Sequence, residues 1–278
     1  MEKKFWKPSI TSQFIHCPIP YHMDTYRGCS FNCSYCFARD FVTFSRRNKI
    51  GNEKSFSYLV GNRADLLEKW IERTNTKEYD YNKPEEVAFK ERIPIKIGAT
   101  ADPFPYAEWK SKITYDILKV FHKFDYPVEI QTKNPAGICD IADDFKNPNW
   151  TIAVTLISTD EKFIKVCEPN APSAKSRLDA IKKLTEKGYK IMIKIQPAIY
   201  PKIIEDLPEL IKMAKEAGCW AVNIEGLKVR ITMPEGEKKI MNKIGDFLGH
   251  NIIEYYKTFG NISGSDNSCV DTMILNFL

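Results

Sequence analysis

Three cysteines lie close together near the amino end of the chain. Residues 26–37 read YRGCSFNCSYCF, which places Cys29, Cys33 and Cys36 at C-x3-C-x2-C spacing. On one loop this spacing can bring three thiolates around one inorganic centre. A 4Fe–4S cluster bound by three cysteines leaves one iron without a protein ligand, and a small molecule can bind there. The stretch therefore predicts a cluster with an open iron.

A structural zinc site is the alternative reading of these cysteines. Structural zinc requires four ligands, usually supplied as two pairs. The fourth ligand would have to be Cys17, His16 or His22, and none of them follows a regular spacing from the other three. The spacing therefore favours iron and sulfur over zinc.

The other five of the eight cysteines are scattered along the chain and form no second group of ligands: Cys17, Cys139, Cys167, Cys219 and Cys269. We expect most of them to be small buried hydrophobic residues. Cys17 precedes the cysteine motif closely enough that a role as a hydrogen donor stays open.

The composition sets limits on the class of protein. The chain has 278 residues, of which 43% are hydrophobic and 28% charged, and the net charge is +5. No run of 18 apolar residues is present, and the amino end lacks the apolar core of a secretion signal, so we expect a cytoplasmic protein with reduced thiols and no membrane span. The mild positive charge gives only weak support for an anionic partner.

Strand-like and helix-like segments alternate along most of the chain. The expected strands are His22–Tyr26, Arg92–Thr100, Val128–Lys133, Thr151–Ser158, Lys190–Ile199 and Ala221–Val229. The expected helices are Asn62–Thr74, residues 113–124, Ser173–Lys187 and Asp206–Ala217. Asn62 and Asp206 are the predicted N-caps, and Gly188 and Gly218 the predicted ends. In the last helix, the residues expected to face the core are Leu207, Leu210, Ile211 and Ala214.

This alternation predicts an α/β protein with a parallel sheet, closed or partly closed as a barrel. Six strands are two fewer than a complete (β/α)8 barrel contains. We expect one globular domain, in which residues 1–20 form an amino-terminal extension, residues 21–232 the barrel and residues 233–278 a helical extension. That extension either caps the open side of the barrel or shapes the entrance to its site.

The cysteine motif, with Tyr35 before its last cysteine, resembles that of radical S-adenosylmethionine (SAM) enzymes, which fold as partial (β/α)6 TIM-like barrels. The resemblance extends to the spore photoproduct lyase-like branch. Residues 24–29 (DTYRGC) are similar to its Asn-Pro-Tyr-Arg-Gly-Cys, and residues 168–178 (EPNAPSAKSRL) match its Glu-Pro-x-x-Pro-x-x-x-x-Arg-Leu. Thr132 and Lys133 match the end of its third strand. The similar region covers about residues 8–230.

The resemblance implies a reaction and two cofactors. The open iron of the cluster would bind the amino and carboxylate groups of SAM, and one electron would cleave SAM to methionine and a 5′-deoxyadenosyl radical. That radical would abstract hydrogen from a substrate, in a lyase or transferase-type reaction. A reductant such as flavodoxin or ferredoxin would be the electron donor.

Polar residues stand at the ends of the expected strands, where functional groups gather in parallel barrels. They are Thr100, Asp102, Thr132, Lys133, Thr155, Ser158, Gln196, Asn223 and Glu225. By resemblance, Thr100 and Asp102 would hold the SAM amino group, and Lys133, Thr155 and Ser158 its carboxylate or ribose. Tyr35 and Phe37 would flank the adenine, and Gln196 and Asn223 complete the predicted SAM site. The catalytic residue is unassigned.

Some of these residues have a purely structural alternative. Any polar residue at a strand end can be satisfied by its neighbours, although a buried Lys133 requires an anionic partner, which the SAM carboxylate supplies. Glu168 and Arg177 can likewise form an ion pair that fixes a loop to a helix.

The sequence departs from the lyase at one position. Ala99 stands where spore photoproduct lyase has its hydrogen-donor cysteine, which makes the same repair reaction improbable. Three functions stay open: a radical SAM enzyme acting on a nucleic acid or nucleotide, one modifying a peptide or small metabolite, and a non-catalytic iron–sulfur or zinc protein. No cysteine-rich carboxyl-terminal segment follows, which argues against peptide-processing enzymes that carry auxiliary clusters there.

Overall fold

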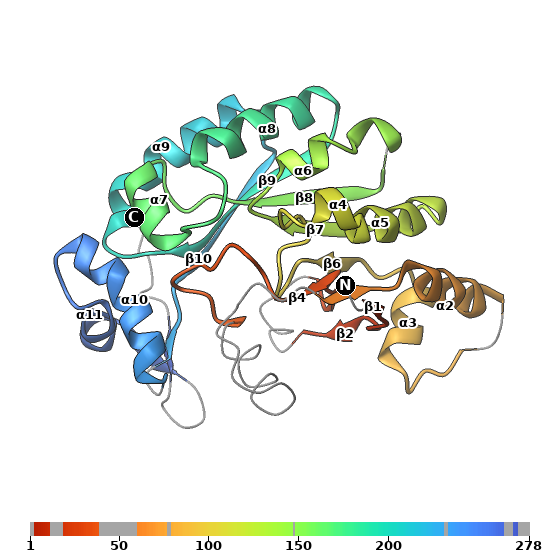
Figure 1. Ribbon diagram of the computed structural model, residues 1–278, viewed down its shortest axis with the longest axis horizontal. Coiled ribbons are helices and arrows are strands. Elements are labelled where there is room, and N and C mark those ends of the chain that lie inside the picture. The colour runs from red at the N-terminus through yellow and green to blue at the C-terminus, as the bar shows by residue number, and fades with distance from the viewer. Residues whose placement is uncertain are drawn as a thin grey trace.

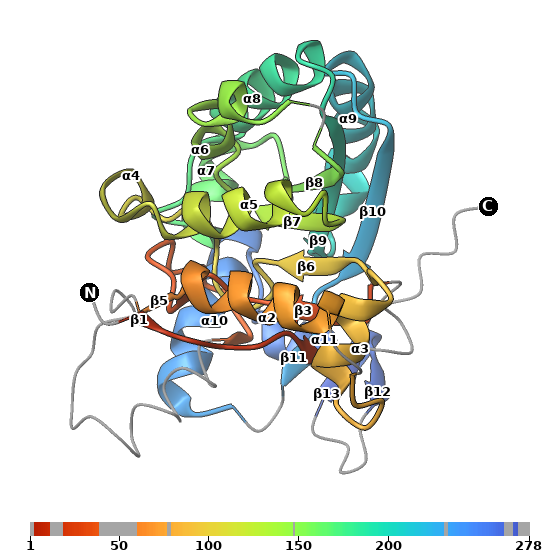
Figure 2. The same ribbon diagram turned by 90° about the vertical axis from the view of Figure 1, so that its right-hand side faces the viewer.

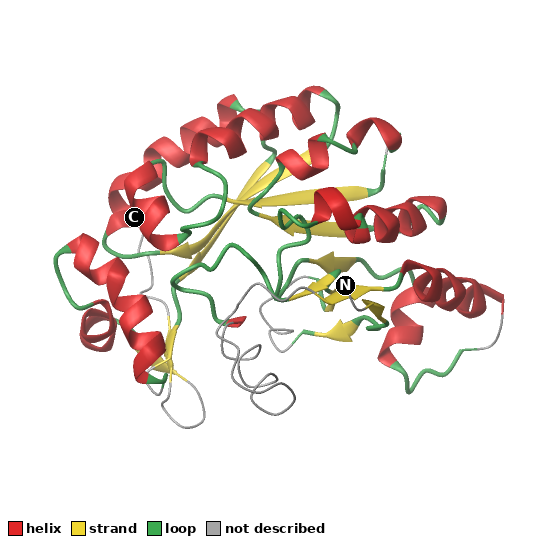
Figure 3. Cartoon of the chain, viewed as in Figure 1, coloured by secondary structure: helices red, strands yellow, loops and turns green. Residues whose placement is uncertain are grey.

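A curved seven-stranded sheet forms the centre of the molecule (Figures 1 and 3). The computed structural model describes residues 3–11, 19–38, 60–76, 79–146, 148–230, 233–263 and 269–271. The strand order is β10-β9-β8-β7-β6-β3-β2. The strands are β2 (Ser9–Ile10), β3 (Tyr21–Met23), β6 (Ile95–Ile97), β7 (Val128–Thr132), β8 (Trp150–Thr155), β9 (Lys190–Ala198) and β10 (Ala221–Gly226). All six predicted strands are present and pair in parallel from β3 to β10, with β2 antiparallel at the edge.

The sheet is open, as expected for a partial TIM-like barrel. Within the described residues β10 pairs only with β9, and β2 pairs only with β3. The side chains of β7 alternate between buried (Val128, Ile130) and half-buried (Glu129, Gln131), so only one of its faces is fully covered. The half-buried face therefore lines the inside of the curve.

Helices cover the outer face of the sheet (Figure 1). They are α2 (Ala64–Thr76), α3 (Pro84–Lys90), α4 (Glu108–Ser111), α5 (Ile113–Lys123), α6 (Ala136–Cys139), the 3-10 turn Ala142–Asp144, α7 (Glu161–Cys167), α8 (Ala174–Glu186) and α9 (Lys202–Glu216). The predicted α8 is confirmed: the Ser173 hydroxyl caps it by accepting from Ser176 N, and Gly188 follows it with φ of +85°. No helix in the described part of the chain has the length and apolar character needed to cross a membrane.

Helix α9 differs from the prediction. It begins at Lys202, so Asp206 lies inside the helix and is not its N-cap. The Asp206 carboxylate instead accepts from the Ser158 hydroxyl at 2.5 Å and from Lys202 Nζ at 2.5 Å. The prediction that Ile211 faces the core is also wrong. It is 46% exposed, because the buried positions of α9 recur one residue earlier, at Leu210.

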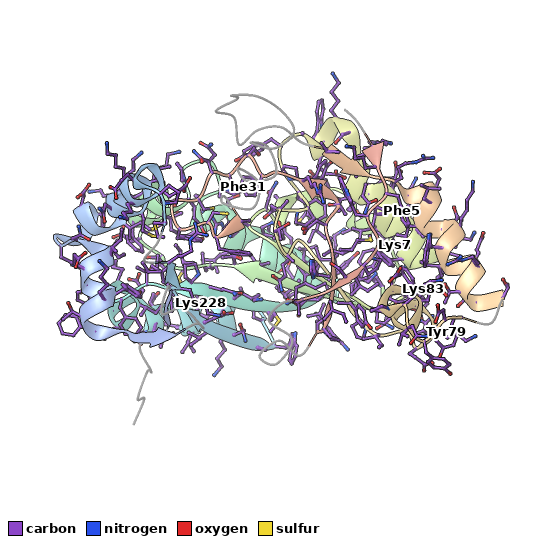
Figure 4. The ribbon with its side chains drawn as sticks, turned by 90° about the horizontal axis from the view of Figure 1, so that it is seen from below. Phe5, Lys7, Phe31, Tyr79, Lys83 and Lys228 are labelled. Atoms are coloured by element: carbon purple, nitrogen blue, oxygen red, sulfur yellow. The ribbon has the colours of Figure 1, made fainter. Side chains whose placement is uncertain are left out.

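The amino-terminal segment belongs to a small sheet that carried no sequence signal. It contains β1 (Lys3–Lys4), β5 (Val60–Asn62) and β4 (Tyr26–Arg27). Asn62 lies in this sheet and is not the N-cap of α2: its amide oxygen accepts from Trp6 N at 3.1 Å and Arg63 N at 2.8 Å. Nearby, Phe5 packs on α2, and Lys7 pairs with Glu85 at 2.9 Å at the end of the molecule that carries α2 and α3 (Figure 4).

The carboxyl-terminal segment forms two helices and a three-stranded sheet. These are α10 (Glu235–Leu248) and α11 (Ile252–Phe259), together with β11 (Val229–Arg230), β12 (Asn261–Ser263) and β13 (Cys269–Asp271). The predicted last strand therefore ends at Gly226, and Val229 belongs to the second sheet. Phe247 packs on Phe163 of α7, and Tyr200 N donates to the Tyr256 hydroxyl at 3.0 Å. The segment thus lies at the carboxyl ends of the sheet strands (Figure 1).

Candidate cofactor site

The three motif cysteines lie on the loop that follows β3 and β4. Cys33 is buried, and Cys29 and Cys36 are half-buried. Gly28 has φ of +96° and Asn32 φ of +54°, so the backbone turns sharply on either side of Cys29. Cys36 N donates to the Cys33 carbonyl at 3.2 Å. These turns bring residues that are seven apart along the chain into one compact loop at the carboxyl edge of the sheet.

The thiols occupy different electrostatic surroundings. Burial, together with the Asp102 carboxylate, raises the pKa of Cys29 to about 12. Burial also raises the pKa of Cys33, and the Lys133 ammonium opposes that rise. Free thiols here are protonated at neutral pH, and a bound metal centre would deprotonate them.

The donor set fits an iron–sulfur cluster. The Cys29 and Cys36 thiols lie close enough to Cys33 to raise its pKa. The Lys133 ammonium offsets negative charge beside Cys33. Among the described residues no group of three or more His, Cys, Asp or Glu side chains converges on a single metal ion. A 4Fe–4S cluster binds each cysteine through a different iron, so its ligands need not converge on one point.

Glu168 and Arg177 form the buried ion pair that the sequence suggested as their structural role. Both side chains are fully buried, and Arg177 Nη2 lies 2.5 Å from Glu168 Oε2. Arg177 also donates to the carbonyl oxygens of Thr155 and Pro172, each at 2.9 Å. The guanidinium therefore ties the segment after α7 to the end of β8, with its donors used within the protein.

Glu168 also lies where Lys133 meets the loop that carries the three motif cysteines (residues 28–37, which we call the cluster loop). It accepts a hydrogen bond from the Tyr35 hydroxyl, and Lys133 Nζ lies 3.9 Å from its Oε1 atom. Burial opposes ionisation of Glu168, but Arg177 and Lys133 together lower its pKa. At 3.9 Å the Lys133 contact is too long for a hydrogen bond, so the ammonium retains donors for another anion.

Several predicted SAM contacts already bind protein groups. Asp102 accepts from Thr132 Oγ1 at 2.8 Å, Phe104 N at 2.9 Å and Lys133 N at 2.6 Å, and its carboxylate thereby joins the ends of β6 and β7. Thr100 donates to Asp24 through its hydroxyl and its backbone N–H. Ser158, which is fully buried, donates to Asp206. These side chains brace the strand ends, and their contact with SAM stays a prediction.

The remaining predicted contacts are spread around the same edge. Tyr35 donates to Glu168 and its ring lies beside Lys133 Nζ, and the Thr155 carbonyl accepts from Arg177. Gln196 donates to Glu225 at 2.5 Å, Asn223 is exposed on β10, and Phe37 is 62% exposed. Tyr35 and Thr155 therefore lie around the Glu168–Arg177 pair, Phe37 is exposed next to Cys36, and Gln196 and Asn223 lie on the last two strands of the sheet, β9 and β10.

Sequence reasoning missed the contact between the cluster loop and the end of α7. Ser34 N donates to the Cys167 carbonyl at 2.7 Å, and Ser34 Oγ donates to the Val166 carbonyl at 2.7 Å. The Cys167 thiol is fully buried, and its pKa is raised by burial and then by the nearby Glu168 and Cys33. More than 130 residues separate the two segments, and backbone acceptors carry no sequence signal.

Among the described cysteines outside the motif, the expected burial is complete for Cys167 alone. Cys167 is buried, and Cys139 and Cys219 are half-buried against the core. Cys17 and the side chain of Cys269 lie outside the described residues. Ala99 is half-buried between Gly98 and Thr100 at the end of β6.

No protein-family model matches the chain. Curated relatives are uncharacterised proteins from Mycobacterium tuberculosis (24% identical over 219 residues, 77% of this chain and 60% of the relative) and Acidianus two-tailed virus (32% over 194 residues, 67% and 58%). The chain spans about three fifths of the length of these relatives.

Solved structures share the fold. A spore photoproduct lyase structure matches with a TM-score of 0.58 at 15% identity, covering 87% of this chain and 64% of that one. Spore photoproduct lyase with bound AdoMet and dinucleoside spore photoproduct matches with 0.54 at 17% identity (82% and 62%). Streptococcus suis SuiB bound to the precursor peptide SuiA matches with 0.51 at 15% identity (85% and 46%). These likenesses confirm the predicted partial-barrel fold, which the chain shares with spore photoproduct lyase and SuiB.

Proposed function

We propose that this chain is a radical SAM enzyme in which Cys29, Cys33 and Cys36 bind a 4Fe–4S cluster. The observation that carries the proposal is the placement of Cys29 and Cys36 near Cys33, whose thiol lies beside the Lys133 ammonium at the carboxyl edge of the sheet. Functional groups of parallel barrels lie at this edge. The shared fold with a lyase structure that contains AdoMet supports the same assignment.

The residues around the cluster would bind and orient SAM. When bound, cluster and SAM together supply a carbon radical that removes hydrogen from a substrate. Lys133 would bind the SAM carboxylate, since its ammonium lies at the edge of ion-pair distance from Glu168 and keeps free donors. The Glu168–Arg177 pair would hold Lys133 and Tyr35 in place. The other proposed contacts are those predicted from the sequence: Phe37, Thr100, Asp102, Thr155, Ser158, Gln196 and Asn223.

A nucleic acid or nucleotide is the proposed substrate class. The fold likeness to a lyase holding a dinucleoside supports it, as does the net charge of +5. Ala99 offers no thiol at the end of β6, so the substrate reaction would differ from that of the lyase. A peptide substrate is the second candidate, supported by the likeness to SuiB bound to its precursor peptide.

Production of 5′-deoxyadenosine tests the proposal. The protein is purified and reconstituted with iron and sulfide without oxygen, then mixed with SAM and dithionite. We expect 5′-deoxyadenosine and methionine in equal amounts, with more turnover when an oligonucleotide is present. A fully loaded, reduced cluster that yields no 5′-deoxyadenosine with any substrate class would contradict the proposal.

A further inference from the structure

The loop that follows β6 is fixed in place by a buried carboxylate. Residues 103–112 read PFPYAEWKSK, and the Glu108 side chain in this loop is buried. Its oxygens accept from Thr114 N at 3.0 Å, Tyr115 N at 2.9 Å and the Tyr26 hydroxyl. We refer to residues 103–112 as the β6 loop. Its backbone is anchored to α5 and to β4, directly before the cysteine motif.

This anchored loop exposes large aromatic side chains and positive charge. Trp109 is 84% exposed and Tyr106 is 60% exposed. Lys110 and Lys112, which follow Trp109 in the chain, are exposed, and neither forms an ion pair with any residue that the structure describes. Exposed aromatic residues on an ordered segment are typical of protein interfaces, where tryptophan and tyrosine dominate the binding energy.

The β6 loop lies against the Cys29 side of the cluster loop. The Tyr106 ring meets the Phe31 ring edge-on at 5.7 Å between centroids, and Phe31 stands between Cys29 and Cys33 in the chain. The Cys29 thiol accepts from the Asp102 backbone N–H. Lys133 and Glu168 lie next to Cys33. The exposed loop is therefore a neighbour of one cluster ligand without being part of the predicted SAM site.

The loop also lies outside the curve of the sheet. Figure 2 shows α4 at the outer margin of the molecule, on the opposite side from β10. A substrate must bring a C–H bond into contact with the radical, which requires access to the inside of the curve. An electron crosses a gap between protein-bound centres, so its donor needs only to dock near the cluster. Position therefore favours an electron carrier over a nucleic acid.

We propose that Tyr106, Trp109, Lys110 and Lys112 form the docking surface for an acidic one-electron carrier protein of the flavodoxin or ferredoxin kind. The two lysines complement the negative charge of the carrier, and the two aromatic rings supply the apolar centre of the contact. On docking, the reduced carrier loses one electron and the oxidised cluster gains it, with no bond formed or broken. This inference rests on the proposed radical SAM function.

Charge reversal on the docking surface tests the inference. The double variant K110E/K112E is compared with the parent and with K182E/K183E, which makes the same charge change at exposed lysines on α8. Cluster reduction is followed by absorbance after mixing with flavodoxin hydroquinone, and separately with photoreduced deazariboflavin, a small reductant that needs no docking surface.

We expect K110E/K112E to lower the rate of reduction by flavodoxin about tenfold or more at low salt, with the difference shrinking as salt rises. The rate with deazariboflavin should be unchanged, and K182E/K183E should behave as the parent does.

A flavodoxin rate that is unchanged in K110E/K112E overturns the docking assignment while leaving the proposed function intact. An unchanged flavodoxin rate together with weakened oligonucleotide binding assigns the surface to a nucleic acid instead. If deazariboflavin fails to reduce any cluster in the parent, the proposed function itself fails, and the docking assignment with it.

Discussion

The two sides of the cluster loop differ in whether their charged side chains are buried or exposed. On the Cys33 side, Glu168 and Arg177 are fully buried and paired at 2.5 Å, with Lys133 beside them. On the Cys29 side, Lys110 and Lys112 project from an anchored loop into solvent. The charges on the Cys33 side are paired within the protein, whereas those on the Cys29 side are exposed to solvent.

The difference separates residues that orient a cofactor from residues that recognise a partner. A buried ion pair contributes little net stability over a well-packed apolar alternative, but removing one partner is costly because an unpaired charge stays buried. Such a pair fixes geometry around a cofactor. Exposed charges contribute little to folding and act mainly on association rates. We therefore expect the Cys33 side to govern binding and stability, and the Cys29 side to govern encounter with a partner.

The largest effect is expected at the ligands that both sides share. Replacing Cys29, Cys33 or Cys36 with alanine should abolish 4Fe–4S loading, because two thiolates leave two irons without protein ligands. Iron and sulfide analysis with the visible absorption spectrum measures the loss. Cys219→Ala, at a half-buried cysteine that packs against the core, is the control and should load fully. A full cluster in any of the three motif variants would refute the ligand assignment.

The next largest effect is expected from breaking the buried pair. Arg177→Met should lower the free energy of unfolding by about 3 to 5 kcal/mol, because Glu168 stays buried with one cation fewer. Lys175→Met, on the same helix but in a surface pair with Asp179, should cost less than about 1 kcal/mol. Denaturant unfolding of both variants gives the comparison, and equal losses would show that burial of the pair does not matter.

Lys133 also lies on the Cys33 side, and here we expect the main effect on SAM binding. Lys133→Ala should weaken SAM binding by about 1.5 to 3 kcal/mol, roughly tenfold to a hundredfold, because a charge-assisted hydrogen bond is lost. Calorimetric titration of the loaded protein measures it, with Lys123→Ala, a surface lysine paired with Glu68, as the control. The cluster should remain. Unchanged SAM affinity would remove Lys133 from the site.

Lowering the pH should reduce the difference in the free energy of unfolding between the parent and the Glu168→Gln variant. The Glu168 pKa lies below its ordinary value of 4.5, chiefly because Arg177 and Lys133 overcome the effect of burial. A lowered pKa stabilises the folded state above about pH 4.5, and that contribution disappears as the pH falls through the folded pKa. The difference in unfolding free energy should therefore shrink below pH 4.5. A difference that is constant with pH would show that Glu168 is not held ionised.

The sequence predicts the parts of the fold that depend on periodicity and the parts of the site that depend on spacing. The six strands, the helices α5 and α8 and the cysteine loop all follow from such patterns. The exact start of α9 does not, because Asp206 is an equally good cap by composition, and its contacts with Ser158 and Lys202 inside the folded protein leave no pattern in the sequence. The Ser34–Cys167 contact is invisible for a similar reason, since it runs through backbone atoms.

The smallest effect on folding is expected at Trp109, and this sharpens the contrast between the two sides. Because its side chain is 84% exposed, Trp109→Ala should change the free energy of unfolding by less than about 0.5 kcal/mol. Phe31→Ala, which removes a fully buried ring from the same contact region, should cost about 3 to 5 kcal/mol. A large loss in Trp109→Ala would mean that the ring supports the β6 loop. With folding unaffected, any slowing of reduction by flavodoxin in Trp109→Ala reports on docking alone.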